Sequence, residues 1–282
     1  MLSLFTLAAA AYPQILVHGH RGARAMRPEN TIPAFTYALE QGVDVLELDL
    51  AVTKDNVVVV SHDSVINTVF CSLDAGAKKS STLVIREMTF AEVQRWDCGS
   101  KAHPQFPRQR PVNGTRIPTL DSVLSLAKSK PVEFNIETKM AKGRPDWAPL
   151  PEEFVRLLLD VVRKHGIEKR MILQSFDFRT LHVARKLAPS LRLSALFPDT
   201  PEEAQRDYVE VAGEAGAPIV SPQFTTVTPE KVAQAHAAGL QVIPWTANTP
   251  AEWDRLIAAK VDAIITDDPA ALIEHLRTRG LR

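Results

Sequence analysis

The stretch VLELDLAVTKDNVVVVSHD, residues 45–63, decides how the fold of this chain is interpreted. Its beginning, Val45–Leu50, is almost wholly apolar, which is typical of a strand buried on both faces of a parallel sheet. Glu47 and Asp49 interrupt this run two positions apart, so both carboxylates point to the same face of the strand. Unpaired carboxylates are costly to bury. The stretch therefore predicts a central strand with a charged site at its end.

The rest of the stretch predicts a hairpin. Asp55-Asn56 separates two β-forming runs, as the two residues of a tight turn do. If these two residues form the turn, His62 lies opposite Asp49. The returning strand would then bring a histidine beside the carboxylate pair, where it is a candidate general acid or base. A histidine that only caps the end of the strand is the alternative.

Outward from this stretch, short apolar runs alternate with amphipathic runs along the chain. We predict strands at Ile15–Val17, Val45–Leu50, Val132–Ile136, Met171–Leu173, Leu191–Leu196, Ile219–Val220, Leu240–Ile243 and Ala263–Ile265. We predict helices at Thr31–Glu40, Leu120–Ala127, Pro151–His165, Asp177–Leu187, Pro201–Ala212, Pro229–Ala238, Pro250–Ala259 and Pro269–Leu276. This alternation predicts an α/β fold, a (β/α)8 or TIM barrel that fills residues 12–282 as one catalytic domain; a doubly wound open sheet is the alternative.

One connection is far longer than the others. Residues 64–118 separate the second strand region from its helix, and they contain both cysteines of the chain, Cys71 and Cys98. A connection of this length in a compact domain is usually a lid or a small subdomain. It leaves the carboxyl end of a barrel strand, so we expect it on the face where barrel enzymes keep their active sites. In an exported protein the cysteines could form one disulfide, whereas in a cytosolic protein they stay reduced.

Polar residues follow the first predicted strand in the run His18-Gly19-His20-Arg21-Gly22. His20 is a second candidate acid or base. The planar guanidinium of Arg21 suits a phosphate group. We interpret His18 as a packing residue. The run lacks the glycine and lysine spacing of a nucleotide-binding P-loop, so it gives no support to nucleotide hydrolysis.

Two further strand ends carry candidate residues. Glu137 and Lys139 share one face of the third strand, where the glutamate could complete an oxygen-ligand metal site and the lysine could neutralise an anion. A structural salt bridge between these two residues is the alternative. Trp245 follows a later strand and either lines a pocket or packs in the core. Together these residue types favour phosphoester chemistry with a hard divalent cation, Mg²⁺ or Ca²⁺.

Composition narrows the class of protein. The 282 residues include 33 basic and 33 acidic side chains, so a nucleic-acid backbone is a poor candidate partner. The apolar share of 45% is that of a soluble globular protein, and no apolar run is long enough to span a membrane. Residues 1–11 are apolar and end in alanines, which predicts a secretory signal segment truncated at its start and therefore export. An extra apolar element packed on the barrel of a cytoplasmic protein is the alternative.

In these motifs the chain resembles the glycerophosphodiester phosphodiesterase family. The resemblance covers nearly the whole chain and rests on several short motifs in the same order. They are His20-Arg21-Gly22, Pro28-Glu29-Asn30-Thr31, Glu47-Leu48-Asp49, Thr53-Lys54-Asp55, Ser61-His62-Asp63, Pro118-Thr119-Leu120 and Glu137-Thr138-Lys139, with weaker support from Gln174-Ser175-Phe176, Trp245-Thr246 and Thr266-Asp267.

The resemblance implies a role for each motif. The expected roles are His20 and His62 as the acid and base; Glu47, Asp49 and Glu137 as ligands of one divalent cation; Arg21 and Lys139 as phosphate-binding residues; Glu29 and Asn30 as organisers of the loop around Arg21, with Asn30 also capping the first helix; and Gln174, Phe224 and Trp245 as the lining of the substrate side. The insertion is expected over the glycerol side of the substrate.

The implied reaction is hydrolysis of a small glycerophosphodiester to glycerol 3-phosphate and an alcohol. Two routes stay open: direct attack by water, or prior attack by the neighbouring glycerol hydroxyl to give a cyclic phosphate. One alternative function is a lipid-active phosphodiesterase of the phospholipase D or phospholipase C barrel type. A lipid-active enzyme should offer an exposed apolar rim or a basic surface, and the neutral net charge argues against it. A barrel that only binds phosphodiesters is the third alternative, and it has no use for two placed histidines.

Overall fold

The computed structural model describes residues 14–198 and 200–282, so the predicted signal segment, residues 1–11, lies outside the described residues. The strands are β1 Leu16–Gly19, β2 Val45–Val52, β3 Val58–Val60, β4 Ser72–Leu73, β5 Trp96–Asp97, β6 Glu133–Thr138, β7 Met171–Ser175, β8 Arg192–Phe197, β9 Ile219–Pro222, β10 Gln241–Val242 and β11 Ala263–Thr266. The helices are α1 Ile32–Gln41, α2 Phe90–Val93, α3 Leu120–Leu126, α4 Pro151–His165, α5 Phe178–Leu187, α6 Tyr208–Ala215, α7 Pro229–Ala237, α8 Pro250–Ala258 and α9 Pro269–Thr278.

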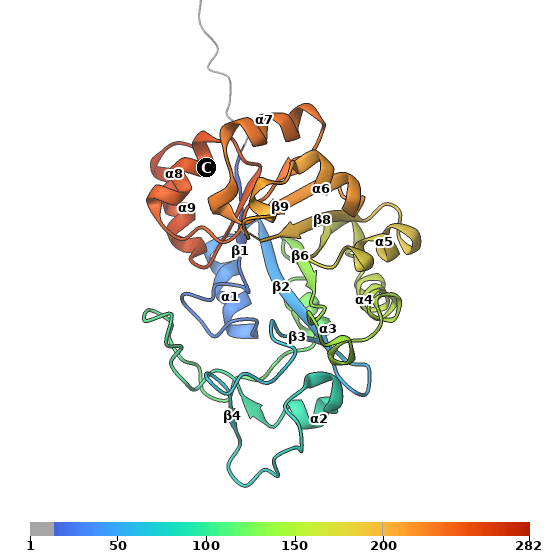
Figure 1. Cartoon of the computed structure of the whole chain (residues 1–282). Coiled ribbons are helices and arrows are strands. Elements are labelled where there is room, and N and C mark those ends of the chain that lie inside the picture. Colours follow the sequence, from blue (N-terminus) through green and yellow to red (C-terminus); the bar gives the residue numbers. More distant parts are fainter. Residues whose placement is uncertain (1–13, 199) are drawn as a thin grey trace, which may run out of the picture.

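Eight of these strands form the predicted (β/α)8 barrel. Their order is β10-β9-β8-β7-β6-β2-β1-β11, with parallel pairing between neighbours. The two ends of this order are joined where the Ile265 N–H donates to the Pro244 carbonyl at 3.0 Å and the Asp262 N–H donates to the Val242 carbonyl at 3.0 Å. The alternative of an open doubly wound sheet is therefore wrong. The helices pack around the outside of the strands (Figure 1).

Burial explains why the apolar runs became the barrel strands. Every residue of β2 is buried, including its two carboxylates, and β7 and β9 are buried along their whole lengths. A strand covered on both faces has no need of polar alternation, which is why it reads as a continuous apolar run. Helices α1, α7 and α8 begin as predicted, each with a threonine cap followed by a proline in the first turn.

One helix start and one register differ from the predictions. Helix α6 begins at Tyr208 rather than Pro201, because the Asp207 side chain accepts hydrogen bonds from two N–H groups of its first turn. In the hairpin of β2 and β3, Leu50 pairs with Val60, so Asp49 lies opposite Ser61 and not His62. The loop between these strands spans residues 53–57 rather than two residues, and this shifts the register by one.

The insertion, residues 64–118, folds as a small unit at one end of the barrel (Figure 1). Strands β4 and β5 pair in antiparallel fashion, and Cys71 and Cys98 are joined by a disulfide. The insertion has a separate apolar cluster, which it shares with the outer face of the hairpin. This cluster contains Ala51, Val59, Ile66, Cys71, Ile85, Met88, Val93, Trp96, Cys98 and Ile117. Among the described residues, no helix is long and apolar enough to cross a membrane.

Candidate active site

Three carboxylates meet at the carboxyl end of β2 and β6. The parallel register places Asp49 beside Glu137, and Glu47 points to the same side of the barrel. One oxygen from each of the three side chains lies within 4.8 Å of the others, and all three residues are buried. We call these residues the acidic triad. The triad unites the three metal ligands that the sequence predicts.

The chemistry of the acidic triad fits a metal ion. Burial and the neighbouring Asp49 raise the pKa of Glu47 well above its usual range, and burial also raises the pKa of Glu137. Burial acts to raise the pKa of Asp49 too, but the positive groups around it, led by His62, lower it overall. Three crowded, buried carboxylates repel one another, and a hard divalent cation with oxygen ligands relieves that repulsion. The triad can therefore hold a metal ion.

Two cationic side chains already touch the acidic triad. The Lys139 Nζ atom lies 2.8 Å from Glu137 Oε1 and 3.7 Å from Asp49 Oδ1. The Arg21 Nε atom lies 3.4 Å from Asp49 Oδ2. Arg21 has a left-handed backbone (φ 49°), and its N–H donates to Glu47 Oε2 at 2.8 Å. Both predicted phosphate-binding residues are thus held at the edge of the triad.

His20 follows β1 and is held by a partner from the far end of the chain. Its Nδ1 atom lies 2.5 Å from Asp267 Oδ1, and its Nε2 atom faces Glu47 Oε2 at 3.9 Å. The Asn248 amide donates to Asp267 Oδ2 at 2.8 Å. Burial lowers the pKa of His20, and the charge of Asp267 opposes this shift. His18 is wholly buried, and burial lowers its pKa to about 3, which agrees with its predicted packing role.

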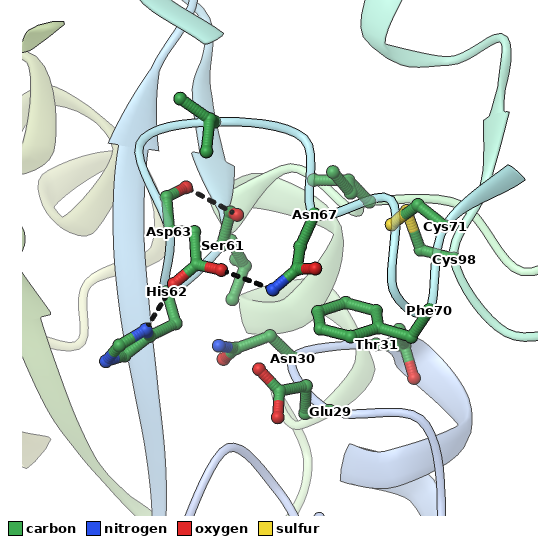
Figure 2. A pocket seen from close by; sticks show the side chains of 13 residues that line it. Glu29, Asn30, Thr31, Ser61, His62, Asp63, Asn67, Phe70, Cys71 and Cys98 are labelled. Carbon is green, nitrogen blue, oxygen red and sulfur yellow. Dashed lines mark hydrogen bonds and ion pairs between the residues drawn. A yellow bond between two sulfur atoms is a disulfide. The ribbon is translucent and has the colours of Figure 1, made fainter. Parts of the chain in front are cut away.

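His62 follows β3 and lines the same cavity as the acidic triad. Its Nδ1 atom lies 2.8 Å from Asp63 Oδ1, and the Asn67 amide donates to Asp63 Oδ2 at 2.8 Å (Figure 2). The hydrogen bond from His62 lowers the pKa of Asp63, so this carboxylate is ionised near neutral pH. The His62 side chain is 31% exposed, compared with 11% for His20.

Both histidines line one cavity together with the acidic triad. Trp245 and Phe176 form one wall as an edge-to-face pair with ring centres 5.5 Å apart, so Trp245 lines the pocket. Gln174 also lines it, and its amide donates to Glu47 Oε1 at 2.8 Å. Phe224 is not among the lining residues; it packs against the barrel core and contacts the guanidinium of Arg255.

The loop after β1 is braced as expected, with one correction. Glu29 accepts a hydrogen bond from Arg21 at 2.7 Å, and Asn30 donates to Asp49 Oδ2 at 2.8 Å. Asn30 does not cap α1; the Thr31 side chain accepts the hydrogen bond from the Ala34 N–H instead. Both loop residues also line a second, small cavity, which His62 lines as well (Figure 2).

Sequence reasoning missed three polar residues at this site. Asp267 contacts His20 and Asn248 contacts Asp267, although sequence reasoning gave neither residue a role in the site. Arg24 lines the cavity, with its Nε atom 3.3 Å from Glu29 Oε2 and 3.7 Å from Asp267 Oδ1. For Asp267, the signals were a strand-end position and the weak Thr266-Asp267 motif, and neither indicates a partner at the other end of the sequence.

Comparison with known proteins agrees with this geometry. Residues 20–271 match the model of the Glycerophosphoryl diester phosphodiesterase family. A Glycerophosphodiester phosphodiesterase of Caldanaerobacter subterraneus subsp. tengcongensis is 32% identical over 268 residues, which cover 94% of this chain and 99% of that protein. A Glycerophosphodiester phosphodiesterase of Bacillus subtilis is 29% identical and covers 91% of this chain and 84% of its own length.

Solved structures give the same result for the fold. A structure from Silicibacter pomeroyi DSS-3, of the glycerophosphoryl diester phosphodiesterase type, has a TM-score of 0.85 at 32% identity and covers 96% of each chain. An Oleispira antarctica phosphodiesterase was solved with the product sn-glycerol-3-phosphate. It has a TM-score of 0.77 at 21% identity and covers 94% of this chain and 97% of its own. At that identity the likeness shows the fold alone.

The fold and the site together define a class, the barrel hydrolases of phosphate esters, in which charged residues at the strand ends act on a phosphoryl group. Within this class the chain belongs to the glycerophosphoryl diester phosphodiesterase family, whose enzymes hydrolyse glycerophosphodiesters to glycerol 3-phosphate.

Proposed function

We propose that the chain hydrolyses small glycerophosphodiesters in the cavity between His20 and His62, and that both histidines transfer protons. The observation that carries this proposal is the placement of the two rings. Each ring uses Nδ1 to contact an aspartate, and both rings line the cavity that contains the acidic triad. A binding barrel would need neither ring held in this way.

The acidic triad would hold one divalent cation, Mg²⁺ or Ca²⁺, since buried carboxylate oxygens suit both ions. When bound, the ion would supply positive charge that polarises the phosphoryl group and offsets the charge of the triad. The preference between the two ions depends on ligand number and flexibility.

Arg21 and Lys139 would bind the phosphoryl oxygens. Both side chains are more than four-fifths buried, and both lie at the lip of the triad, where an anionic phosphodiester can replace a carboxylate as their partner. A guanidinium can contact two phosphoryl oxygens at once, whereas an ammonium acts as a compact charge. In a site removed from water these contacts stabilise the charge that develops in the transition state.

One histidine removes the proton from the nucleophilic oxygen as that oxygen bonds to phosphorus, and the other gives a proton to the alkoxide as its bond to phosphorus breaks. Nε2 is the atom available for each transfer, since Nδ1 of each ring contacts an aspartate. The nucleophile is water in direct hydrolysis, or the adjacent glycerol hydroxyl in the route through a cyclic phosphate. The same two rings serve either route.

The test is a coupled assay for release of glycerol 3-phosphate from glycerophosphocholine, glycerophosphoethanolamine and glycerophosphoinositol. We expect the wild type to release glycerol 3-phosphate and to lose this activity after chelation. The cation that restores the activity, Mg²⁺ or Ca²⁺, is then the ion that the site uses. His62→Ala should lose at least about 99% of the activity, and substitution of His182, an exposed histidine of α5, by alanine is the matched control. A folded, metal-loaded protein that releases nothing from these substrates, but cleaves a lysophospholipid, would favour the lipid-active alternative.

We also propose that the protein is exported. The disulfide between Cys71 and Cys98 supports this, because disulfides persist in oxidising compartments and are rare in the cytosol. Mass spectrometry of denatured, unreduced protein purified from its native host counts the thiols. Two alkylated cysteines would contradict export.

A further inference from the structure

The segment between β3 and β4 builds a second layer behind His62. One oxygen of Asp63 contacts the ring at Nδ1, and the other accepts a hydrogen bond from the Asn67 amide (Figure 2). The Asp63 carboxylate is therefore held between two groups, and its direction decides the direction of the imidazole. Asn67 belongs to the insertion, whereas His62 belongs to the hairpin of the barrel.

Asn67 itself is fixed by several contacts within the insertion. Its side-chain oxygen accepts the Val69 N–H at 3.1 Å, which closes a local turn. Its backbone carbonyl accepts the N–H groups of Phe70 at 3.3 Å and Cys71 at 2.9 Å. Cys71 is joined by the disulfide to Cys98, which lies further along the insertion. The turn that carries Asn67 is thus tied covalently to the rest of the small unit.

The barrel repeats this arrangement at the other histidine. Asp267 binds His20 Nδ1 through Oδ1 and accepts the Asn248 amide through Oδ2, the same atoms in the same roles. Two histidine–aspartate–asparagine chains built from unrelated segments of the sequence face one cavity. A carboxylate on Nδ1 keeps the proton on that nitrogen in the neutral ring and leaves Nε2 as the acceptor. The duplication indicates that the outer asparagine serves the histidine rather than the local turn.

We propose that Asn67 is a positioning residue for the phosphodiesterase reaction, acting through Asp63 to fix the direction and the tautomer of His62. The proposal rests on the proposed function of His62 as a proton-transfer group. It gives the insertion a part in the chemistry: this unit supplies one end of the chain of side chains that orients a histidine of the barrel.

The sharpest test is Asn67→Asp. This substitution keeps the side-chain shape and the oxygen that accepts the Val69 N–H, so the local turn survives, but it replaces the donor to Asp63 with a second carboxylate. We expect kcat to fall about tenfold or more, the size of one hydrogen bond to a charged group, with KM changed less than about twofold. Asn113→Asp adds the same charge at an exposed position of the insertion and should leave both constants unchanged.

The exchange variant Asp63→Asn with Asn67→Asp gives a second, independent measurement. In it the amide at position 63 can accept from His62 Nδ1 and donate to the carboxylate at position 67, so the chain of hydrogen bonds is restored with its charge moved outward. We expect kcat to recover to within about threefold of the wild type, allowing for a remaining difference of less than about 1 kcal/mol. Recovery by exchange is a result that a merely structural role for Asn67 would not produce.

Nitrogen NMR of labelled histidine separates this proposal from the proposed function. In the wild type we expect the neutral His62 ring to carry its proton on Nδ1, and in Asn67→Asp we expect a mixture of the two tautomers. An unchanged tautomer in Asn67→Asp, or an unchanged kcat, would overturn the positioning role. If the wild type releases no glycerol 3-phosphate from any glycerophosphodiester, the proposed function fails, while the tautomer measurement still decides whether Asn67 orients the ring.

Discussion

His20 and His62 are held by matching side chains, but the two arrangements come from different parts of the molecule. The partners of His20 come from the segment that follows β11 and from the loop before α8, so that a residue directly after β1 depends on closure of the barrel. The partners of His62 lie within five positions of it, in the segment that enters the insertion. One ring is nearly buried, and the other is about a third exposed.

The same arrangement of a histidine, an aspartate and an asparagine can therefore be built from residues far apart in the sequence or from near neighbours. We call His20, Asp267 and Asn248 the barrel arm. Its geometry can change only if the barrel itself changes. We call His62, Asp63 and Asn67 the insertion arm. Its geometry depends on a small unit with its own apolar cluster and disulfide. A substitution in one arm should therefore leave the other arm unchanged, whereas a substitution in the acidic triad should affect both.

The largest effect is expected where the two arms meet. Glu47→Gln keeps the shape of the side chain but removes one of the three buried carboxylates, so the cation should bind far more weakly. Loss of several kcal/mol of charge stabilisation corresponds to a fall in kcat/KM of about 10³-fold. Calorimetric titration with Mg²⁺ or Ca²⁺ and the glycerol 3-phosphate assay measure the two changes.

The control for this experiment is Glu133→Gln, at the opposite end of β6, where the glutamate pairs with Arg192 on the outside of the site. It should leave both cation affinity and activity near the wild-type values. Cation binding by Glu47→Gln with unchanged affinity would show that the triad is not the metal site.

The two histidine substitutions should then distinguish the arms. His20→Ala and His62→Ala should each lower kcat by about 10²- to 10⁴-fold, the usual contribution of an acid or base. Only His20→Ala should also lower the free energy of unfolding by more than about 1 kcal/mol, because it opens a buried space and removes the hydrogen bond between the histidine and Asp267. Urea unfolding followed by tryptophan fluorescence measures this difference; equal losses of stability would contradict the division into two arms.

Removal of the disulfide should affect the insertion arm alone. Closing the loop between Cys71 and Cys98, which are 27 positions apart, contributes about 3–4 kcal/mol in the chain-entropy model. The paired substitution Cys71→Ser with Cys98→Ser should therefore speed hydrogen exchange at the amides of β4, β5 and α2, while the barrel strands keep their protection. Equal loss of protection in β2 and β6 would show that the insertion and barrel unfold as one unit.

The last expected effect is a pH dependence of stability that belongs to the barrel arm and leaves activity near neutral pH unaffected. His18 has a folded-state pKa of about 3, well below its unfolded value of about 6.5, because burial disfavours its charged form. Between these values the unfolded chain binds a proton that the folded chain does not, so stability falls as pH falls. His18→Leu should reduce the slope of unfolding free energy between pH 6 and pH 4 by up to about 1.4 kcal/mol per pH unit. His182→Leu, at an exposed position, is the control, and an unchanged slope in His18→Leu would exclude this origin.

Much of the fold could be predicted because it is encoded locally. Buried parallel strands are short apolar runs, and all eight predicted barrel strands are present within a few residues of the expected bounds. The start of α6 was predicted wrongly because Pro201 is the same helix-start signal as the prolines of the other helices. The helix begins instead where the Asp207 side chain accepts hydrogen bonds from N–H groups of the first turn. The hairpin register was wrong by one because it depends on the backbone of residues 53–57, which composition does not specify.

Part of the site could also be predicted, because it too is encoded by local patterns in the sequence. Glu47, Asp49 and Glu137 could be grouped because strand periodicity and parallel neighbours place their side chains on one side of the barrel. Asp267 and Asn248 could not be assigned, since a short polar residue after a strand is usually a helix cap and nothing local distinguishes an exception.

The barrel, the acidic triad and the two histidines could be predicted from the sequence, because strand period, chain order and the carboxyl ends of parallel strands fix these features to a first approximation. The partners of each histidine and the direction of its ring come from contacts that form when the chain folds. Those contacts depend on closure of the barrel, on the length of the loop at residues 53–57 and on the fold of the insertion. Each of them sets distances of a few ångströms between residues whose spacing along the chain carries no such information.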